Sequence, residues 1–281
     1  MKHIVITGVS SGIGYAATAD LLAHGYHVLG SVRRAADAER LQAEFGERFT
    51  PLLFDVTDHA AVQTAVAQTQ ALLGGQNLAG LVNNAGVSVL GPAMHVPLAD
   101  FRRQFEVNLF GLLDVTQQFL PLLGARRDAP RPRGRIVNVS SVSGKIAYPF
   151  YGAYAASKHA LEALSDALRR ELLLYGIDVI VLEPGTTQTP IIDKAGAQAG
   201  AYAETDYGPF IEKLAQKELA ERRTSALPVE AVAVKIRAAL ENGRPRTRTP
   251  IPRKWLTGWL IPRWLPDRWL DWLVARRLGF K

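Results

Sequence analysis

The glycine-rich turn at Gly8–Gly14 constrains the fold of this chain more than any other feature. An apolar run over Lys2–Thr7 predicts a short buried strand before it, and a helix is predicted from about Gly12 to His24. Glycines permit a tight turn and let backbone amides approach a pyrophosphate at a helix N-terminus. A strand, a glycine-rich turn and a helix in this order therefore indicate a dinucleotide site. Its candidate residues are Gly8, Ser10, Ser11, Gly12, Ile13 and Gly14.

The same turn also matches the G-x-S-x-G sequence of a hydrolase nucleophile elbow, in the strand–turn–helix setting that such a serine needs. That fold requires a catalytic histidine late in the chain. The last of the six histidines is His159, far ahead of the C-terminus. We therefore reject the hydrolase interpretation.

Strand-like and helical segments alternate along the rest of the chain. Such alternation predicts an α/β fold with a single doubly wound parallel sheet, right-handed crossovers and helices on both faces. A length of 281 residues with 48% apolar content suits one large domain better than two. Further strands are predicted at 26–32, 49–54, 78–82, 136–139, 177–182 and 247–250, and further helices at about 59–73, 98–123, 151–175, 209–223 and 228–241.

Two arginines follow the second predicted strand. A site that prefers NAD uses Asp or Glu about 20 residues past the glycines to hold the ribose 2′-hydroxyl. Arg33 and Arg34 stand there instead. Two cations suit a 2′-phosphate, so we expect NADP(H) in preference to NAD(H). The alternative interpretation is a solvated pair of surface arginines.

Other strand ends and one helix also carry candidate residues. Ligands of such sheets bind outside the carboxyl ends of the strands, where Asp55 and Val56 follow the third strand. Small residues in Asn83–Gly86 allow close backbone approach to a ligand, with a plain turn as the alternative. Asn108 lies among apolar residues of the long helix and must find hydrogen-bond partners, as a structural residue or as part of a proton relay.

The stretch from Arg135 to Lys158 carries the chemistry. Tyr154 and Lys158 are four residues apart, so a helix projects them from one face. A phenol has a pKa of about 10, and a nearby ammonium lowers it, so Tyr154 can exchange a proton with a carbonyl or alcohol oxygen. Ser141, at the end of the preceding strand, can hydrogen-bond the same oxygen as charge develops. These residues carry no electrons, so a cofactor must supply the hydride.

Amino-acid composition and charge exclude several kinds of site and of binding partner. The chain has no cysteine, which removes disulfides, thiolate catalysis and cysteine metal sites, and we expect no metal. We expect no signal peptide ahead of the first strand and no spanning helix of roughly 18 apolar residues, and hence a cytoplasmic protein. The net charge of +7 is concentrated in 244–281, with ten Lys/Arg and two Asp/Glu, which argues against general nucleic-acid binding.

The C-terminal part changes character after the sixth strand. Within an expected dehydrogenase domain over residues 1–250, residues 190–225 are expected to form a substrate lid. The C-terminal extension, residues 251–281, holds all five tryptophans, interleaved with Arg and Lys. Tryptophan and cations on an amphipathic helix suit peripheral contact with a membrane. The alternative is packing on the domain, because aromatic stripes are usually core.

Five features in order resemble the short-chain dehydrogenase/reductase family, in its NADP(H)-type, Rossmann-fold branch. T-G-x-x-x-G-I-G matches Thr7–Gly14, N-N-A-G matches Asn83–Gly86, Y-x-x-x-K matches Tyr154–Lys158, P-G-x-x-x-T matches Pro184–Thr189, and Ser141 precedes the tyrosine by 13 residues. The resemblance covers residues 1 to about 250. More loosely, residues 190–281 look like the C-terminal region of hydroxysteroid and retinol dehydrogenase-like members.

The resemblance implies a role for each matched residue. Tyr154 would be the proton donor and acceptor, Lys158 would lower its pKa and hold the nicotinamide ribose, and Ser141 would orient the substrate oxygen. Asn108 would hold a water that links Lys158 to solvent. The remaining implied cofactor contacts are Asp55, Val56, Asn83, Ala85, Gly86, Pro184, Gly185, Thr187 and Thr189.

Taken together, these features predict an NADP(H)-dependent oxidoreductase, a short-chain alcohol dehydrogenase or carbonyl reductase. Its substrate would be a fairly apolar small molecule with a secondary alcohol, ketone or aldehyde group, against an apolar wall at residues 147–151. By family analogy the long helices predict a homodimer or homotetramer. Two alternatives stay open: a non-catalytic dinucleotide-binding sensor or scaffold, and another reaction on the same fold, such as epimerisation.

Overall fold

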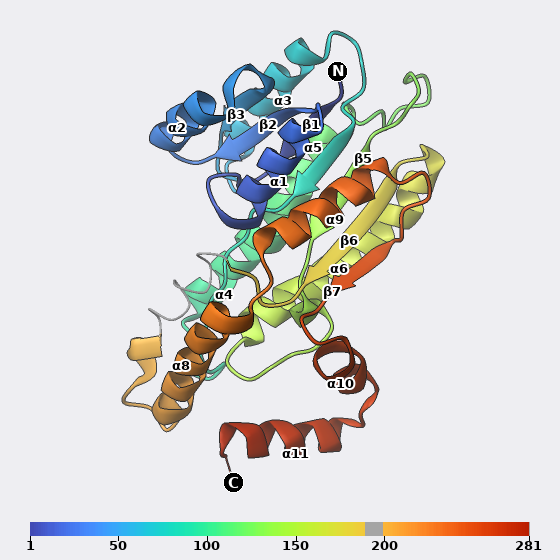
Figure 1. The fold of residues 1–281 in the computed structure, drawn as a ribbon. Coiled ribbons are helices and arrows are strands. Elements are labelled where there is room, and N and C mark those ends of the chain that lie inside the picture. The colour runs from blue at the N-terminus through green and yellow to red at the C-terminus, as the bar shows by residue number, and fades with distance from the viewer. Residues whose placement is uncertain (189–198, 281) are drawn as a thin grey trace.

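A seven-stranded parallel sheet forms the centre of the computed structural model, which describes residues 1–188 and 199–280 (Figure 1). The strand order is β3-β2-β1-β4-β5-β6-β7, so the chain winds outward from β1 in one direction and from β4 in the other. This order confirms the predicted doubly wound α/β sheet. The strands are β1 His3–Ile6, β2 His27–Val32, β3 Phe49–Leu53, β4 Gly80–Asn83, β5 Arg135–Val139, β6 Asp178–Pro184 and β7 Arg248–Ile251.

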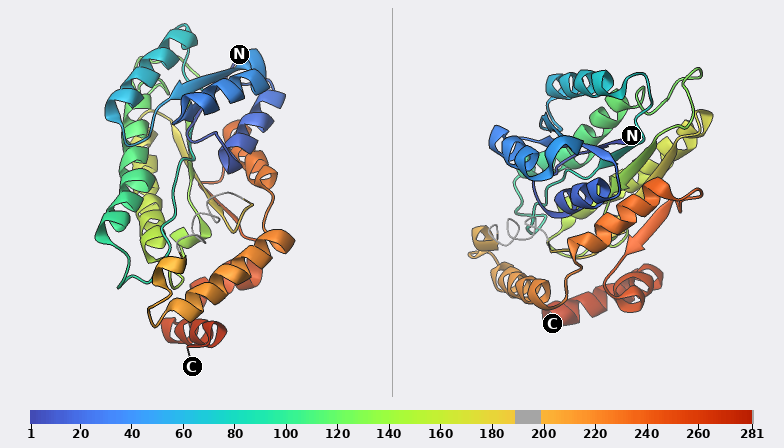
Figure 2. Two further views of the ribbon diagram at one scale, coloured as in Figure 1. Left: turned by 90° about the vertical axis from the view of Figure 1, so that its left-hand side faces the viewer. Right: turned by 45° about the horizontal axis from the view of Figure 1, so that its top comes forward.

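Helices cover both faces of the sheet (Figure 2). Helices α1, α2 and α9 pack on one face, and α3, α5 and α6 pack on the other. The α-helices are α1 Gly12–Ala23, α2 Ala35–Phe45, α3 His59–Leu73, α4 Leu98–Phe105, α5 Leu112–Phe119, α6 Gly152–Glu171, α8 Gly208–Ser225, α9 Val229–Glu241, α10 Ile261–Trp264 and α11 Asp267–Leu278. Short 3₁₀ or π turns occupy Gly46–Arg48, Glu106–Gly111, Val142–Gly144, Leu172–Leu174, Ala199–Tyr202 and Leu256–Leu260.

Successive side chains of each strand enter different cores. In β1, Ile4 and Ile6 pack on the α1 side and Val5 packs on the α3 side, because strand side chains alternate between the two faces. Both faces are covered by helices, so the strands of such a sheet are apolar at nearly every position. All six residues of β2 are buried. Short apolar runs within the strands, such as Ile4–Ile6 and Val179–Leu182, made them recognisable in the sequence.

Helix α9, late in the sequence, packs directly on helix α1. Arg237 Nε donates a hydrogen bond to Asp20 Oδ2 at 2.8 Å, and the Tyr26 hydroxyl donates to Glu241 Oε1 at 3.1 Å. These contacts fix the helix that follows the glycine-rich turn against a segment more than 200 residues away. The first helix therefore receives its outer cover from the last helix of the sheet domain.

The predicted long helix at 98–123 is interrupted in the structure. A π turn at Glu106–Gly111 separates α4 from α5. Asn108 lies inside the turn and is fully buried; its Oδ1 accepts from the Val87 amide at 2.9 Å, and its Nδ2 donates to the Val87 carbonyl oxygen at 3.0 Å. Because a π turn inserts an extra residue into a helix, it changes the direction of the following side chains and often marks a functional site.

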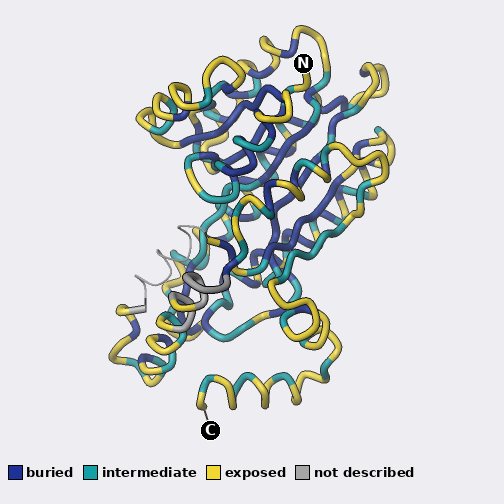
Figure 3. The backbone as a smooth tube through the Cα atoms, viewed as in Figure 1, coloured by how far each residue is buried: buried dark blue, intermediate teal, exposed yellow. Residues whose placement is uncertain are grey.

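Helix α8 and the C-terminal extension lie beyond the carboxyl edge of the sheet, with α8 connected to β6 and α10 and α11 to β7 (Figure 1). Packing on the domain holds for Trp259, which is buried. Helix α11 contains no buried residue and is drawn in the colours of exposed and intermediate positions in Figure 3, and its Leu278 packs against the cluster around Phe150. Part of the expected lid, residues 190–198, lies outside the described residues.

Candidate active site

The structure brings Ser141, Tyr154 and Lys158 together near the carboxyl end of β5. Ser141 follows β5 closely, while Tyr154 and Lys158 lie one turn apart near the start of α6. Ser141 forms a hydrogen bond with the Tyr154 hydroxyl. The Lys158 ammonium nitrogen is 5.8 Å from the centre of the Tyr154 ring and donates to the Val139 carbonyl oxygen at 2.9 Å. The three residues therefore form one cluster, as their spacing in the sequence predicts.

Burial is the main cause of the pKa shifts of Tyr154 and Lys158. Burial raises the pKa of Tyr154, and the hydrogen bond with Ser141 opposes only part of that rise. Burial also lowers the pKa of Lys158 to about 8, against the opposite effect of the Glu162 carboxylate one turn further along α6. The net shift of the Tyr154 pKa is therefore opposite to the lowering expected from Lys158, whose ammonium is held by the Val139 carbonyl.

Asn108 connects the π turn to helix α6. Its Nδ2 lies 3.2 Å from Ser157 Oγ, and the Ser157 hydroxyl donates to the Tyr154 carbonyl oxygen at 2.8 Å. Gln104, one turn earlier, accepts from the Val89 amide at 2.7 Å. These bonds hold the loop after β4 against the helix turn that carries Tyr154. Gln104 was missed in the sequence, where its spacing of four residues before Asn108 was the available signal.

The glycine-rich turn has the backbone geometry of an anion site. Gly8 and Gly12 have φ angles of +73° and +63°, a conformation that favours glycine. A Cβ on Gly14 would lie 2.3 Å from the Gly8 carbonyl oxygen, so only glycine fits at this position. Ser11, the N-cap residue of α1, makes no side-chain capping bond. The first amides of α1 are therefore free of a side-chain cap, and the turn fits the pyrophosphate of a dinucleotide.

Both arginines after β2 are exposed and lie beside carboxylates. Arg33 Nη1 is 3.7 Å from Asp55 Oδ2, and Arg34 Nε is 2.7 Å from Asp37 Oδ2. Their side chains remain 65% and 78% exposed. The pairing with Asp37 agrees with the interpretation of Arg34 as a solvated surface charge, whereas Arg33 has the longer and looser ion pair and so suits a phosphate better.

Arg40 is a third cation near the glycine-rich turn, and the sequence analysis missed it. Its Nη2 donates to the Ser10 carbonyl oxygen at 3.0 Å, while its Nη1 lies 3.4 Å from Glu44 Oε2. The contact with Ser10 places a guanidinium group against the turn itself. The available signal was its position on α2, which starts directly after the two arginines.

Asn83, the last residue of β4, and Ala85, in the loop after it, contact different parts of the protein. The Asn83 side chain is buried, and its Nδ2 donates to Thr116 Oγ1 and Asn138 Oδ1, both at 2.9 Å. It therefore connects β4 with α5 and β5 inside the protein. Ala85 lies against the glycine-rich turn, where a Cβ on Gly8 would approach its Cα to 3.0 Å. This close packing explains why the loop consists of small residues.

Three further predicted cofactor residues lie close to this region. Asp55 is half-exposed at the end of β3, and Val56 is buried, with its carbonyl oxygen 2.7 Å from the place of a Cβ on Gly111. Gly86 lies against Asn108, whose Oδ1 would be 3.3 Å from a Cβ there. The loops after β3 and β4 are thus packed directly on the π turn.

The predicted residues after β6 lie beside the start of the C-terminal extension. Pro184 is the last residue of β6 and pairs with Ile251, and the Gly185 amide donates to the Ile251 carbonyl oxygen at 3.0 Å. Thr187 is buried. Thr189, the predicted partner of the carboxamide, lies outside the described residues.

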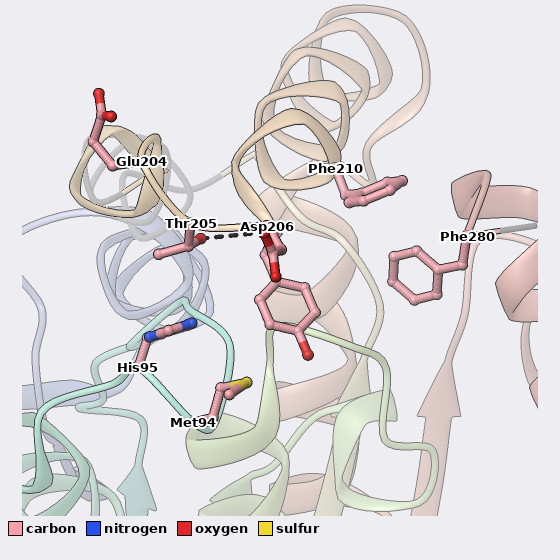
Figure 4. Close-up of a pocket in the computed structure, with 8 residues that line it drawn as sticks. Met94, His95, Glu204, Thr205, Asp206, Phe210 and Phe280 are labelled. Atoms are coloured by element: carbon pink, nitrogen blue, oxygen red, sulfur yellow. Dashed lines mark hydrogen bonds between the residues drawn. The ribbon is translucent and has the colours of Figure 1, made fainter.

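A pocket of about 730 Å³ lies between the segment after β4, α8 and the C-terminal end of the chain (Figure 4). Tyr207, one of its lining residues, has its ring centre 5.8 Å from that of Phe150, in the loop before α6. Phe210 and Phe280 also line the pocket, and their rings meet edge to face at 4.8 Å. The apolar wall predicted at 147–151 is therefore extended by aromatic residues that the sequence analysis missed.

Charged side chains gather next to Lys158, between α6, β6 and β7. Glu162 Oε2 is 3.1 Å from Lys145 Nζ and 2.9 Å from Arg248 Nε. Glu183 is fully buried in β6, and its Oε1 lies 3.7 Å from Arg248 Nε. Burial, together with the charge of Glu162, raises the pKa of Glu183 to about 7. The cluster supplies the field that acts on Lys158 through Glu162.

Known proteins resemble this chain over its whole length. It is 42% identical to the NADPH-dependent 3-dehydrocapnine reductase of Ornithobacterium rhinotracheale, covering 99% of this chain and 98% of that protein. It is 33% identical to mouse retinol dehydrogenase 5, covering 97% and 89%. Among solved structures, a short-chain dehydrogenase from Streptomyces avermitilis matches with a TM-score of 0.74 and 26% identity, covering 99% and 96%.

The family model described as short chain dehydrogenase matches residues 2–200. This range contains the glycine-rich turn, the loop after β4 and the Ser141, Tyr154 and Lys158 cluster. The chain therefore belongs to the short-chain dehydrogenase family of oxidoreductases.

Proposed function

We propose that the protein is an NADP(H)-dependent carbonyl reductase or alcohol dehydrogenase for a fairly apolar substrate, with Tyr154 as general acid and base. The observation that carries this proposal is the convergence of Ser141, Tyr154 and Lys158 at the sheet edge that also carries the glycine-rich turn. A phenol, a hydroxyl and an ammonium at one point suit proton transfer to a carbonyl oxygen.

The Tyr154 phenol donates the proton in the reducing direction. Bound NADPH would supply the hydride to the carbonyl carbon. Ser141 hydrogen-bonds the substrate oxygen, and Tyr154 passes its proton to that oxygen as the C=O double bond becomes C–O. Because burial raises the pKa of Tyr154, the phenol holds its proton at neutral pH and is ready to act as the acid. The ammonium of Lys158 then stabilises the phenolate that remains.

Three features support NADP(H) as the cofactor. The residues of the glycine-rich turn fit a pyrophosphate at the N-terminus of α1. Arg33 and Arg40 present cations at the end of β2 and at Ser10, where a 2′-phosphate would be neutralised. The relative from Ornithobacterium rhinotracheale, 42% identical, is named an NADPH-dependent reductase.

The aromatic side of the pocket supports an apolar substrate part, while His95, Glu204, Thr205 and Asp206 line its polar side. Its wall joins Phe210 and Phe280 to Phe150, four residues before Tyr154. We place the reacting carbonyl at Ser141 and Tyr154 and the apolar part of the substrate in the pocket. The relatives named for 3-dehydrocapnine and retinol agree with a substrate of this chemical class, and the described part of the proposed lid at 190–225 borders the same pocket.

The Tyr154→Phe variant tests this function. We expect reduction of apolar ketones with NADPH to fall about 10²- to 10⁴-fold in kcat, because the proton donor is lost, while NADPH binding is kept. Tyr175→Phe, directly after the 3₁₀ turn that follows α6, is the matched control and should keep full activity. Equal activity of wild type and Tyr154→Phe would refute the role of Tyr154, and NADPH binding without turnover of any carbonyl would favour the sensor or scaffold.

Assembly and location belong to the same proposal. We expect residues 1–250 to act as the catalytic domain of a cytoplasmic homodimer or homotetramer paired through α4, α5 and α6, which light scattering of the purified protein would test. No helix within residues 1–188 and 199–280 is both long and apolar enough to cross a bilayer.

A further inference from the structure

Helix α11 carries an apolar stripe on its exposed side. Leu270 and Leu278 are half-buried, and Leu278 packs against the aromatic cluster around Phe150 and Phe210. Trp269, Trp272 and Leu273 lie on a different side of the helix at i, i+3 and i+4, and they are 67%, 57% and 43% exposed. A helix that only covers a domain is polar on its outer side. This stripe therefore fits a second apolar partner.

The stripe continues into the segment before α11. Trp264 is 81% exposed, and other large apolar side chains of the extension are also exposed. They are Trp255, Leu256, Leu260 and Ile261. Figure 3 shows the extension mostly in the colours of exposed and intermediate residues. Single exposed apolar residues are ordinary on proteins, but eight large ones between Trp255 and Leu273 are more than a monomer usually exposes on one short segment and indicate an interaction surface.

Cations accompany the exposed tryptophans. The extension contains seven Lys/Arg and two Asp. The Arg276 guanidinium lies 5.4 Å from the Trp272 ring centre, and the Arg263 guanidinium lies 4.9 Å from that of Trp259. Two copies of such a surface would repel each other, whereas anionic lipid headgroups would neutralise it. The charge therefore favours an anionic bilayer over a second copy of this chain as the partner.

The dimensions of α11 fit a position within the membrane interface. A helix of 12 residues is about 18 Å long, whereas the hydrocarbon core of a bilayer is about 30 Å thick. Tryptophan rings with neighbouring arginines prefer the headgroup boundary, where an apolar ring and a charged group are both accommodated. A helix of this kind lies along the surface of the membrane rather than across it.

The same helix connects the stripe to the proposed substrate pocket. Phe280, two residues after α11, has its ring centre 4.8 Å from that of Phe210 and 6.3 Å from that of Phe150. Figure 4 shows Phe210 and Phe280 side by side at the pocket. A membrane under α11 would thus lie next to the pocket wall that belongs to the extension.

We propose that the C-terminal extension docks the protein on an anionic phospholipid surface, with α11 in the interface, and that the pocket at Phe210 and Phe280 takes up the apolar chain of a membrane-dissolved carbonyl substrate there. The uptake step rests on the proposed function. The docking step rests on the exposed stripe and its cations alone.

Vesicle flotation tests the docking step. Full-length protein is compared with the triple variant Trp264→Ser/Trp269→Ser/Trp272→Ser on phosphatidylcholine vesicles with and without phosphatidylglycerol. Leu173→Ser/Leu174→Ser is the matched control, because these leucines are 71% and 65% exposed and lie in the 3₁₀ turn after α6, outside the extension. We expect at least tenfold stronger partitioning onto the anionic vesicles, and at least a tenfold loss in the tryptophan variant alone.

Two outcomes would overturn docking. One is equal partitioning of wild type and the tryptophan variant onto the anionic vesicles. The other is a second copy as the partner, seen when the tryptophan variant converts an oligomer to a monomer in light scattering and leaves vesicle binding unchanged. Circular dichroism of each variant checks that the fold is kept.

Kinetics test the uptake step. A short, water-soluble ketone and a long-chain ketone dissolved in anionic vesicles are each reduced with NADPH. We expect the tryptophan variant to keep kcat/KM for the soluble ketone and to lose at least tenfold for the vesicle ketone. Phe210→Ala/Phe280→Ala should bind vesicles normally and lose the long-chain ketone. Equal rates for wild type and both variants on vesicle ketone would refute uptake. Vesicle binding without reduction of either ketone would refute the proposed function and leave docking intact.

Discussion

The sheet and the C-terminal extension are both rich in large apolar residues, but they place them differently. All six residues of β2 are buried, whereas α11 contains no buried residue. The strands are covered by helices on both faces, while α11 contacts the protein along one side only. Apolar composition alone therefore does not distinguish a core from an interface. The distinction comes from where the cations lie, because arginines accompany the tryptophans of the extension and are absent from β2.

Substitutions in the core and in the extension should differ most in their effect on the free energy of unfolding. Phe119 is fully buried between the sheet and its helices, so Phe119→Ala should lower the free energy of unfolding by about 3 to 5 kcal/mol. Trp272 is 57% exposed, so Trp272→Ala should lower the free energy of unfolding by about 0.5 kcal/mol or less. Urea unfolding followed by circular dichroism measures both. A comparable loss for Trp272→Ala would mean that the extension is part of the core.

Glu183 lies where the sheet and the extension meet. Its protonation should have the next largest effect on the free energy of unfolding. Its pKa is raised from 4.5 to about 7, with Arg263 of the extension among the cations that oppose the rise. The proton is held more tightly in the folded state, so this contribution to stability is complete below about pH 4.5 and is lost as the pH rises through 7. Between pH 5 and pH 8 the loss is about 2 to 3 kcal/mol.

The Glu183→Gln variant should remove this part of the pH dependence, measured as unfolding free energy in urea at pH 5 and pH 8. Glu47→Gln, at an exposed position of the same domain, is the control and should follow the wild type. If Glu183→Gln kept the full wild-type decline between the two pH values, the buried carboxylate would not be its source.

Arginine substitutions in the two regions should differ in their effect on cofactor binding. The expected changes in binding free energy are the smallest of these predictions. Arg33→Ala and Arg40→Ala should each weaken NADPH binding about tenfold, roughly 1.4 kcal/mol, and leave NADH binding nearly unchanged. Arg268→Gln/Arg276→Gln, in the extension, should leave both cofactors unaffected. Nicotinamide fluorescence titrations measure the affinities. Parallel losses for NADPH and NADH in Arg33→Ala would show that this arginine does not recognise the 2′-phosphate.

Much of the sheet could be predicted because most strands contain a short apolar run, such as Ile4–Ile6 in β1 and Val179–Leu182 in β6, between turn residues. The helix at 59–73 was predicted with the bounds that the structure gives it. The π turn could not be predicted, because it depends on Asn108 finding Val87, 21 residues away. Hydrogen bonds to distant loops, rather than local propensity, interrupt that helix.

The cluster of Ser141, Tyr154 and Lys158 was predictable from spacing, since Tyr154 and Lys158 share a helix face and Ser141 closely follows a neighbouring strand. The pocket was not, because Phe280 reaches Phe150 across 130 residues of sequence through a contact that no local pattern contains. The direction of the Tyr154 pKa was also missed. Burial is a property of the assembled site, and its effect on the Tyr154 pKa outweighs that of the hydrogen bond with Ser141.

The packing of α9 on α1 has a consequence for synthesis of the chain. Strands β1 to β4 and the glycine-rich turn are made first, but the side of α1 that packs on α9 is covered only after residues 229–241 have been made. A nascent chain that ends before α9 therefore exposes apolar core residues beside the glycine-rich turn. Such exposed residues are bound by chaperones or lead to aggregation. Because the extension follows α9, the sheet domain can close before the exposed tryptophans emerge, and an early stop before residue 229 should yield insoluble chains.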